Sequence, residues 1–243
     1  MPLRRVKSVI AYDGSAYSGL QKQTSTKNTV THDIEHALAS LQIHDSITAS
    51  GRTDAGVHAT GQVIHFDLPE YWTDLAKLKL NLNRQLRHIR FKHIVFVAGD
   101  FHARFSAKKR LYRYVFKTKE PSLFEQKYIS YYHLFDNHLL QLALSTFEGK
   151  HNFDFLRKTG SDTRSSTRVI YQAKYIQRDN YHFIYFQANG FLRAQVRMMI
   201  NIAMLYAQGK LSMSQLQEQL SCQVVHSPHL APPEGLYLAK VLY

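Results

Sequence analysis

The feature that most constrains the fold is a change of pattern within residues 51–67, GRTDAGVHATGQVIHFD. Up to Gly61 the residues are small, polar and rich in glycine, which permits a sharp turn and a close approach to a ligand. Beyond it, Ile64, Phe66 and Leu68 alternate with the residues between them, as in a half-buried strand. We therefore expect a tight loop that feeds a rigid strand and holds its side chains open to a cleft.

Arg52 and Asp54 make this loop a candidate catalytic site. Residues two apart in an extended segment project to the same side, so the guanidinium can stabilise the carboxylate. The same letters also describe an ordinary turn, in which the aspartate accepts backbone N–H bonds, or a surface salt bridge of little energetic weight. The residues alone leave both interpretations of Asp54 open.

The charge balance favours a polyanionic partner. The chain of 243 residues has 31 Lys and Arg against 18 Asp and Glu, a net charge of +13. Such a protein attracts nucleic acid by its summed field, and the 15 Tyr and 14 Phe can stack on bases. A merely basic surface, or a protein that binds a membrane surface, would share the charge without the base stacking.

The sequence gives little support for a disulfide-linked, metal-dependent or membrane-spanning protein. Cys222 is the single cysteine, so an intrachain disulfide or a cysteine-based metal site cannot form. The histidines follow none of the spacings of a metal-binding helix, and no metal is expected. Because the chain has no apolar run of about 18 residues and no leader pattern, we expect a soluble, cytoplasmic protein.

Periodicity predicts alternating strands and helices. Amphipathic spacing predicts a helix from Ile34 to Leu41, with Thr31 as its N-cap, and a helix from Asn137 to Glu148 after Asp136. Further helices are expected at 74–86, 191–207 and 212–220, and strands at 6–12, 91–98, 110–118, 169–178, 181–188 and 236–243. Asp136 is the expected N-cap of the helix that follows it, Ser212 and Gln215 predict a capping box, and Asp179-Asn180 predicts a hairpin turn.

Several motifs, in order along nearly the whole chain, resemble those of the tRNA pseudouridine synthase A family. The most specific is the nine-residue stretch Gly51–Ala59, which is similar almost letter for letter to the active-site motif of the family. The others are Tyr12-Asp13-Gly14, residues 101–107 (FHARFSA), residues 110–114 (RLYRY), Phe191-Leu192-Arg193 with Val196-Arg197, and residues 231–236 (APPEGL).

The resemblance implies an α+β fold of two related halves, with mixed or antiparallel sheets flanked by helices and an active-site cleft between them. We place the halves at residues 1–118 and 119–243. It also implies an isomerase that converts uridine to pseudouridine in the anticodon stem-loop of tRNA, without a cofactor or metal. Homodimers are the rule in the family, with the substrate arm crossing both subunits.

The resemblance also assigns the site residues. Asp54 is expected to be the nucleophile or charge stabiliser, with Arg52 and Arg197 as electrostatic partners. Tyr112 would stack on the target base, although its pattern alone favours a packed core residue. Leu236 matches an apolar pocket wall. The expected RNA contacts, including those in a basic loop at 158–168, are Arg104, Lys108, Lys109, Arg110, Arg164, Arg168 and Arg193.

One pair of these arginines carries a prediction of its own. In a helix over 191–207, Arg193 and Arg197 would lie one turn apart and repel each other by a few tenths of a kcal/mol, a penalty that a bound anion would remove. Two surface arginines over apolar neighbours are the alternative.

Several positions depart from the family pattern, and two other functions stay open. Leu20 replaces a tryptophan, Arg87 lies where the family has proline and an acid, and Asn201 replaces a glycine. One rival function is an RNA-binding protein with a dead site. The other is a metal-independent ribonuclease that uses His58, His65 or His102 as acid and base.

Overall fold

The structure is a computed structural model that describes residues 3–160 and 163–243. It contains two compact units, Met1–Lys108 with Tyr237–Tyr243 and Lys109–Leu236, called unit 1 and unit 2 below. The boundary predicted from the sequence followed residue 118 and assigned the last strand to the second half. Residues 237–243 of that strand instead belong to unit 1, where the strand pairs in parallel at His58 and Ala59.

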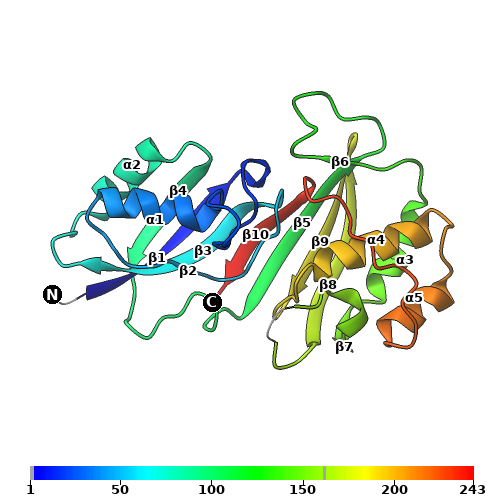
Figure 1. Cartoon of the computed structure of the whole chain (residues 1–243). Helices are drawn as coiled ribbons and strands as arrows, with labels where there is room; N and C mark the ends of the chain where they lie inside the picture. The colour runs from blue at the N-terminus through cyan, green and yellow to red at the C-terminus, as the bar shows by residue number, and fades with distance from the viewer. Residues whose placement is uncertain (1–2, 161–162) are drawn as a thin grey trace. The chain divides into compact units, whose positions relative to one another are not determined.

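Unit 1 is a mixed sheet with two helices (Figure 1). The strand order is β4-β1-β3-β10, with β2 also paired to β3. The helices α1 and α2 contact each other, and α2 packs on β4. The elements are β1 (Leu3–Tyr12), the 3-10 turn η1 (Gly14–Ala16), α1 (Val30–Ser40), β2 (Thr48–Ala49), β3 (His58–Pro69), α2 (Leu75–Gln85), β4 (Ile89–Phe96) and β10 (Leu236–Leu242).

The strand β3 is the centre of unit 1. It pairs with β1 antiparallel along most of its length, and with β10 in parallel at His58 and Ala59. Residues on both of its faces are buried, so the prediction of a half-buried strand was wrong. The strands β3 and β10 approach so closely that a Cβ on Gly61 would overlap the carbonyl oxygen of Ala239. This contact explains why glycine follows the loop at that point.

Unit 2 contains further strands with mixed pairing and its own helices (Figure 1). The strand order is β5-β9-β8-β7, with β6 parallel to β5. The helix α3 packs on β8 and on α4, and α4 contacts α5. The elements are β5 (Lys109–Lys117), β6 (Ser130–Tyr131), α3 (Asn137–Ser145), β7 (Gly149–Asn152), η2 (Asp154–Leu156), β8 (Thr167–Arg178), β9 (Tyr181–Ala188), α4 (Gln195–Ala207) and α5 (Met213–Leu220).

Local sequence signals account for many of these boundaries. Asp136 accepts from the backbone of Leu139 as the N-cap of α3, and Ser212 forms a capping box with Gln215 at α5, both as predicted. The N-cap of α1 is Thr29 and not the predicted Thr31, because the helix begins at Val30. The α+β class, with mixed sheets flanked by helices, is confirmed.

Candidate active site

The loop that carries Asp54 connects β2 to β3 and is fastened to the sheet at its start. The backbone N–H of Ser50 donates to the carbonyl of Val63 at 2.8 Å. The Ser50 hydroxyl donates to Oε1 of Gln62 at 2.6 Å, and Nε2 of Gln62 donates to the carbonyl of Gly51 at 2.9 Å. Gln62 is fully buried. A satisfied buried amide of this kind rigidifies the backbone that it holds.

The middle of the loop is fixed at Thr53, the residue between Arg52 and Asp54. Its hydroxyl lies 2.7 Å from the hydroxyl of Tyr12, and its carbonyl accepts from the backbone of Leu20 at 3.1 Å. Tyr12 and Thr53 are both buried, whereas Asp54 is partly exposed and Arg52 exposed. The loop therefore presents a carboxylate and a guanidinium from a backbone that is anchored between them.

The loop closes with a tight turn at Gly56. The N–H of Val57 donates to the carbonyl of Asp54 at 3.1 Å, and Gly56 has a φ of 76°, in the left-handed region that favours glycine. Gly51, the other glycine of the pair, is not among the residues with positive φ. The predicted glycine-dependent turn therefore lies on the C-terminal side of Asp54.

A second loop, which follows β1, packs beneath this turn. The backbone N–H of Gly14 donates to Nδ1 of His58 at 3.0 Å, and the same nitrogen lies 3.4 Å from Oδ1 of Asp13. A Cβ on Gly14 would overlap the carbonyl oxygen of Val57. The motif Tyr12-Asp13-Gly14 therefore supports the Asp54 loop through three adjacent residues, a role that the sequence analysis did not assign to it.

The candidate histidines of a ribonuclease are committed to structural contacts. His58 is 1% exposed and stacks on Tyr237, with ring centroids 4.7 Å apart. His65 is buried, and its Nδ1 accepts from the backbone of Ala103 at 3.1 Å. Nδ1 of His102 accepts from the backbone of Arg104 at 3.2 Å. Buried or engaged imidazoles are poorly placed to exchange protons with an RNA hydroxyl.

Tyr112 lies on β5 in unit 2. Its side chain is buried, and its ring meets the ring of Phe191 edge to face at a centroid distance of 5.2 Å. The strand places it opposite Phe186 of β9. The contact fixes the plane of the tyrosine ring.

Arg197 lies on α4 and is tied to the segment that precedes β10. Its Nε donates to the carbonyl of Ala231 at 2.7 Å, and its own carbonyl accepts from the N–H of Ala231 at 3.0 Å. The reciprocal pair fixes the stem of a half-buried cation. A few residues on, Leu236 is buried, and its N–H donates to the carbonyl of Pro233 at 2.9 Å.

A polar cluster anchors this segment to unit 2. The Ser130 hydroxyl donates to Oε1 of Glu234 at 3.0 Å, and the hydroxyls of Tyr114 and Tyr132 lie 3.3 Å apart. Burial raises the pKa of Tyr132 to about 12, so this phenol stays neutral at physiological pH. The motif at 231–236 is therefore held by side chains of β6 and its neighbours.

The prediction that Arg193 and Arg197 lie one turn apart on a helix was wrong. The helix α4 begins at Gln195, and Ala194 has a φ of 58°, which turns the chain before the helix. The side chain of Gln195 accepts from the N–H of Leu192 at 2.8 Å and holds this turn. Arg193 lies before the helix, and its Nη1 donates to the carbonyl of Thr159 at 3.0 Å.

Several predicted RNA-contact residues gather in unit 2 near Gly190. Nη1 of Arg110 donates to the carbonyl of Asn189 at 2.9 Å, and Arg168 and Arg110 both reach within 4 Å of where a Cβ of Gly190 would lie. The ammonium of Lys109 lies 4.7 Å from the ring centre of Tyr171. Arg104, Lys108 and Arg164 are exposed. Within the predicted basic loop, residues 161–162 lie outside the described residues.

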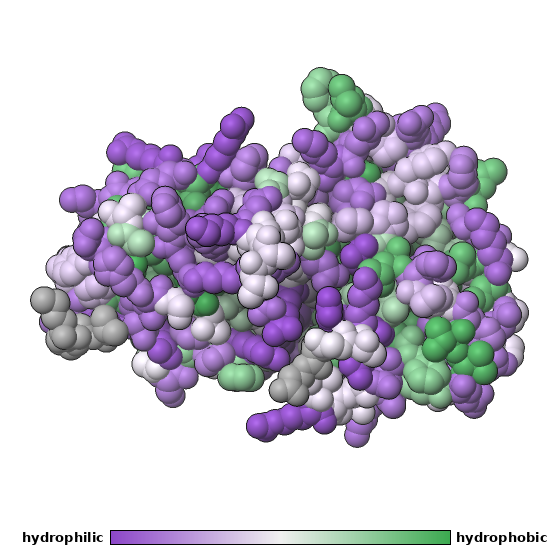
Figure 2. Space-filling view, viewed as in Figure 1, coloured by the Kyte–Doolittle hydropathy of each residue, from purple (hydrophilic) through white to green (hydrophobic). Residues whose placement is uncertain are grey.

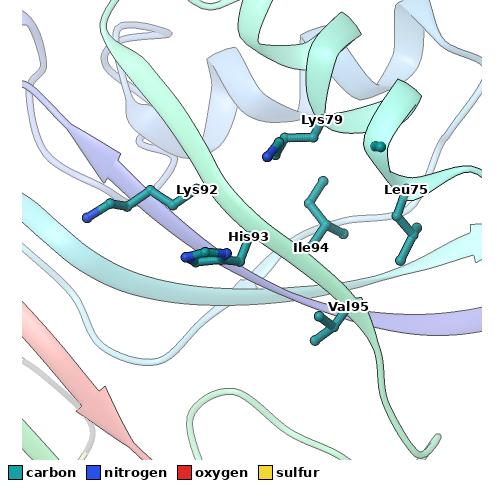
Figure 3. Close-up of a pocket in the computed structure, with 7 residues that line it drawn as sticks. Leu75, Lys79, Lys92, His93, Ile94 and Val95 are labelled. Atoms are coloured by element: carbon teal, nitrogen blue, oxygen red, sulfur yellow. The ribbon is translucent and has the colours of Figure 1, made fainter.

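A groove in unit 1 lies apart from the Asp54 loop. Hydrophilic residues cover most of the face in Figure 2. A shallow groove between α2 and β4 is lined by the residues labelled in Figure 3, including Lys79, Lys92 and His93, and none of them belongs to the Asp54 loop. Within 3–160 and 163–243, no three His, Cys, Asp or Glu residues gather as a metal ion would require, and no helix there is long and apolar enough to cross a membrane.

Comparisons with known proteins agree with the motif at Asp54. Residues 9–106 and 143–243 match the family described as tRNA pseudouridine synthase. The chain is 40% identical to tRNA pseudouridine synthase A of Helicobacter hepaticus, over 98% of each chain. It is 35% identical to the same enzyme of Campylobacter jejuni serotype O:2, over 99% of this chain and 100% of the relative, and 37% identical to that of Lactococcus lactis, over 99% and 98%.

Proposed function

Since the chain belongs to the tRNA pseudouridine synthase family, we propose that it isomerises uridine to pseudouridine in the anticodon stem-loop of tRNA. In this reaction the N1–C1′ bond breaks, the uracil turns while it is held, and C5 bonds to C1′. The C5 proton leaves and N1 takes up a proton, so the RNA keeps its length and composition. The observation that carries the proposal is the partly exposed Asp54 on an anchored loop within the motif of the family.

Asp54 is the group that acts on the target uridine. A carboxylate can stabilise an electron-poor C1′ as in glycoside hydrolysis, covalently or electrostatically, or it can add to the base. Arg52, two residues before it in the sequence, is its electrostatic partner. The hydrogen bonds to Thr53, Ser50 and Gly51 support this role, because a positioned nucleophile needs little reorganisation when the substrate binds.

The proposed roles of the unit 2 residues follow from their fixed stems. Tyr112 stacks on the target base and takes part in C5 deprotonation, and its ring plane is set by Phe191. Arg197 supplies positive charge from a stem bound to Ala231. Leu236 provides an apolar wall. Substitution of each residue, followed by measurement of pseudouridine formation in tRNA, tests each assignment.

The target base lies in a helical arm and must leave its stack, at a cost of a few kcal/mol. Phosphate contacts offset this cost, and we assign them to the exposed or partly exposed cations Arg104, Lys108, Lys109, Arg110, Arg164, Arg168 and Arg193. Arg110 and Arg168 support this assignment, because both approach Gly190 from separate strands.

We further propose that the protein works as a homodimer in the cytoplasm, where tRNA is available. Sedimentation at several protein concentrations measures the mass directly. A protein that stays monomeric at micromolar concentration would rule out the dimer while leaving the chemistry untouched.

The experiment that tests the function treats unmodified tRNA with the purified protein and maps pseudouridine by position-specific chemical modification. We expect pseudouridine in the anticodon arm and full-length RNA. Shortened RNA would favour the ribonuclease. Binding without pseudouridine in any tRNA would favour an RNA-binding protein with a dead site.

A further inference from the structure

Phe105, which lies outside the Asp54 loop, is an exposed aromatic residue that packs against other aromatic rings. Phe105 lies between β4 and β5 and is 75% exposed. Its ring lies against the ring of His102, with centroids 4.3 Å apart and planes at 33°. The His102 ring in turn lies 4.9 Å from that of His65, which is buried on β3. These three rings lead from the core of unit 1 to its surface.

The backbone around Phe105 is rigidly fixed by hydrogen bonds. Nδ1 of His102 accepts from the N–H groups of Arg104 at 3.2 Å and of Phe105 at 3.3 Å. The N–H of His102 donates to the hydroxyl of Ser106 at 3.1 Å, and the N–H of Ser106 returns a bond to the carbonyl of His102 at 2.9 Å. The turn is therefore closed on itself and directs Phe105 outward.

The turn is also tied to the sheet beneath it. The N–H of Ala103 donates to Nδ1 of His65 at 3.1 Å, and its carbonyl accepts from the hydroxyl of Tyr243 at 2.7 Å. Nη1 of Arg5 donates to the carbonyl of Phe101 at 3.2 Å. Phe105 is thus presented by a preformed support, and ordering it on binding would cost little conformational entropy.

The charge around Phe105 points to an anionic occupant. Within unit 1, residues 101–108 include Arg104 and Lys108 and no Asp or Glu. The guanidinium carbon of Arg104 lies 5.5 Å from the centre of the Phe105 ring, on an exposed side chain. An aromatic ring beside flexible cations is the arrangement that proteins use to stack bases of single-stranded nucleic acid.

We propose that Phe105 is a stacking platform for an unstacked base of the tRNA substrate, with Arg104 on a neighbouring phosphate. The inference rests on the proposed function for the identity of the RNA. Phe105 is a positioning residue in this account, because it binds a base other than the one that reacts. Its loss therefore raises the KM for tRNA and leaves kcat near its original value.

The test compares Phe105→Ala, Phe105→Leu and Phe105→Trp with the wild-type protein. Affinity for unmodified tRNA is measured by fluorescence anisotropy, and turnover by pseudouridine formation. We expect Phe105→Ala and Phe105→Leu to weaken binding about 10-fold, the usual effect of one lost base stack, and Phe105→Trp to restore it. Phe124→Ala is the matched control, since Phe124 is an 86% exposed phenylalanine of unit 2.

Salt dependence separates the two proposed contacts. Phe105→Ala should leave the slope of log K against log salt unchanged, whereas Arg104→Gln should reduce its magnitude by about one. Equal affinity and KM in Phe105→Ala and wild type would overturn the stacking role. So would a lower sedimentation mass in Phe105→Ala, which would assign the ring to an interface between copies.

The design also separates failure of this inference from failure of the proposed function. If the wild-type protein binds tRNA and forms no pseudouridine, the function is wrong, and the anisotropy series still decides the stacking. If the wild-type protein is active and Phe105→Ala is unaffected in both assays, the stacking alone is wrong.

Discussion

The hydroxyl oxygens of Tyr12 and Thr53 lie 2.7 Å apart in the buried interior of unit 1, although 41 positions separate them in the sequence. Burial raises the pKa of Tyr12 to about 12, so the phenol keeps its proton and the hydrogen bond persists at any physiological pH. Because Thr53 stands between Arg52 and Asp54, this bond sets the backbone from which both functional side chains extend.

We expect Tyr12→Phe to lower both stability and activity. The substitution leaves the buried Thr53 hydroxyl without this partner, a loss of about 1–2 kcal/mol in the free energy of unfolding. The loosened loop should reduce kcat more than it raises the KM for tRNA, because Asp54 acts in the chemical step. Urea titration and steady-state kinetics measure the two effects.

A double-mutant cycle identifies the source of that loss. Thr53→Val should cost about as much as Tyr12→Phe, and the double variant should be less destabilised than the sum of the two. Strictly additive losses would show that the two hydroxyls do not act as a pair.

Gly14→Ala should damage the site without touching any residue that contacts the substrate. The new methyl group would overlap the carbonyl oxygen of Val57 and displace the end of the Asp54 loop. We expect about 3 kcal/mol of destabilisation and a large loss of activity. Gly99→Ala is the control, because no atom beyond its two neighbours in the chain lies within 4 Å of its Cβ position. Similar behaviour of the two variants would contradict the proposed support of the loop.

The free energy of unfolding should fall as the pH drops through the ordinary range of histidine. Burial lowers the pKa of His65 and of His182, with Arg5 and His102 adding to the effect at His65. As the pH falls, these histidines therefore bind protons in the unfolded chain before they do so in the folded chain. The free energy of unfolding keeps its full value above the unfolded pKa of about 6.5 and declines below it until the histidines of the folded chain are protonated.

The variant His65→Asn tests whether His65 contributes to this pH dependence of stability. Its side-chain oxygen can still accept from the N–H of Ala103, as Nδ1 of His65 does, and it carries no titrating group. Urea titrations at pH 7.5 and 5.5 should show a smaller difference in the variant. An unchanged difference would assign the effect to other groups.

Local sequence signals were sufficient where one short segment decides the structure. The caps at Asp136 and Ser212 and the turn at Asp179 were predicted correctly because a side chain or a dipeptide acts on its own neighbours. The family that Gly51–Ala59 resembles was confirmed by the comparisons. It identified the candidate site before any geometry was available.

Contacts between distant segments escaped the sequence analysis. The late start of α4 depends on the side chain of Gln195 and the left-handed Ala194, which periodicity does not register. The burial of both faces of β3 depends on neighbours far along the chain, and one of them, β10, comes from the opposite end. The hydrogen bond between Tyr12 and Thr53 likewise joins residues that are far apart in the sequence. The roles assigned to Asp54, Arg52, Tyr112 and Arg197 stay predictions until they are measured.

The most direct measurement of the central claim is single-turnover release of tritium from tRNA labelled at uracil C5, with wild-type protein and with Asp54→Asn. Each isomerisation replaces the C5 hydrogen, so tritium reaches the water once for every pseudouridine formed. We predict release by the wild-type protein and none above background by Asp54→Asn, with equal affinity of both proteins for the tRNA. Release by Asp54→Asn at the wild-type rate would contradict the assignment of Asp54 as the catalytic group.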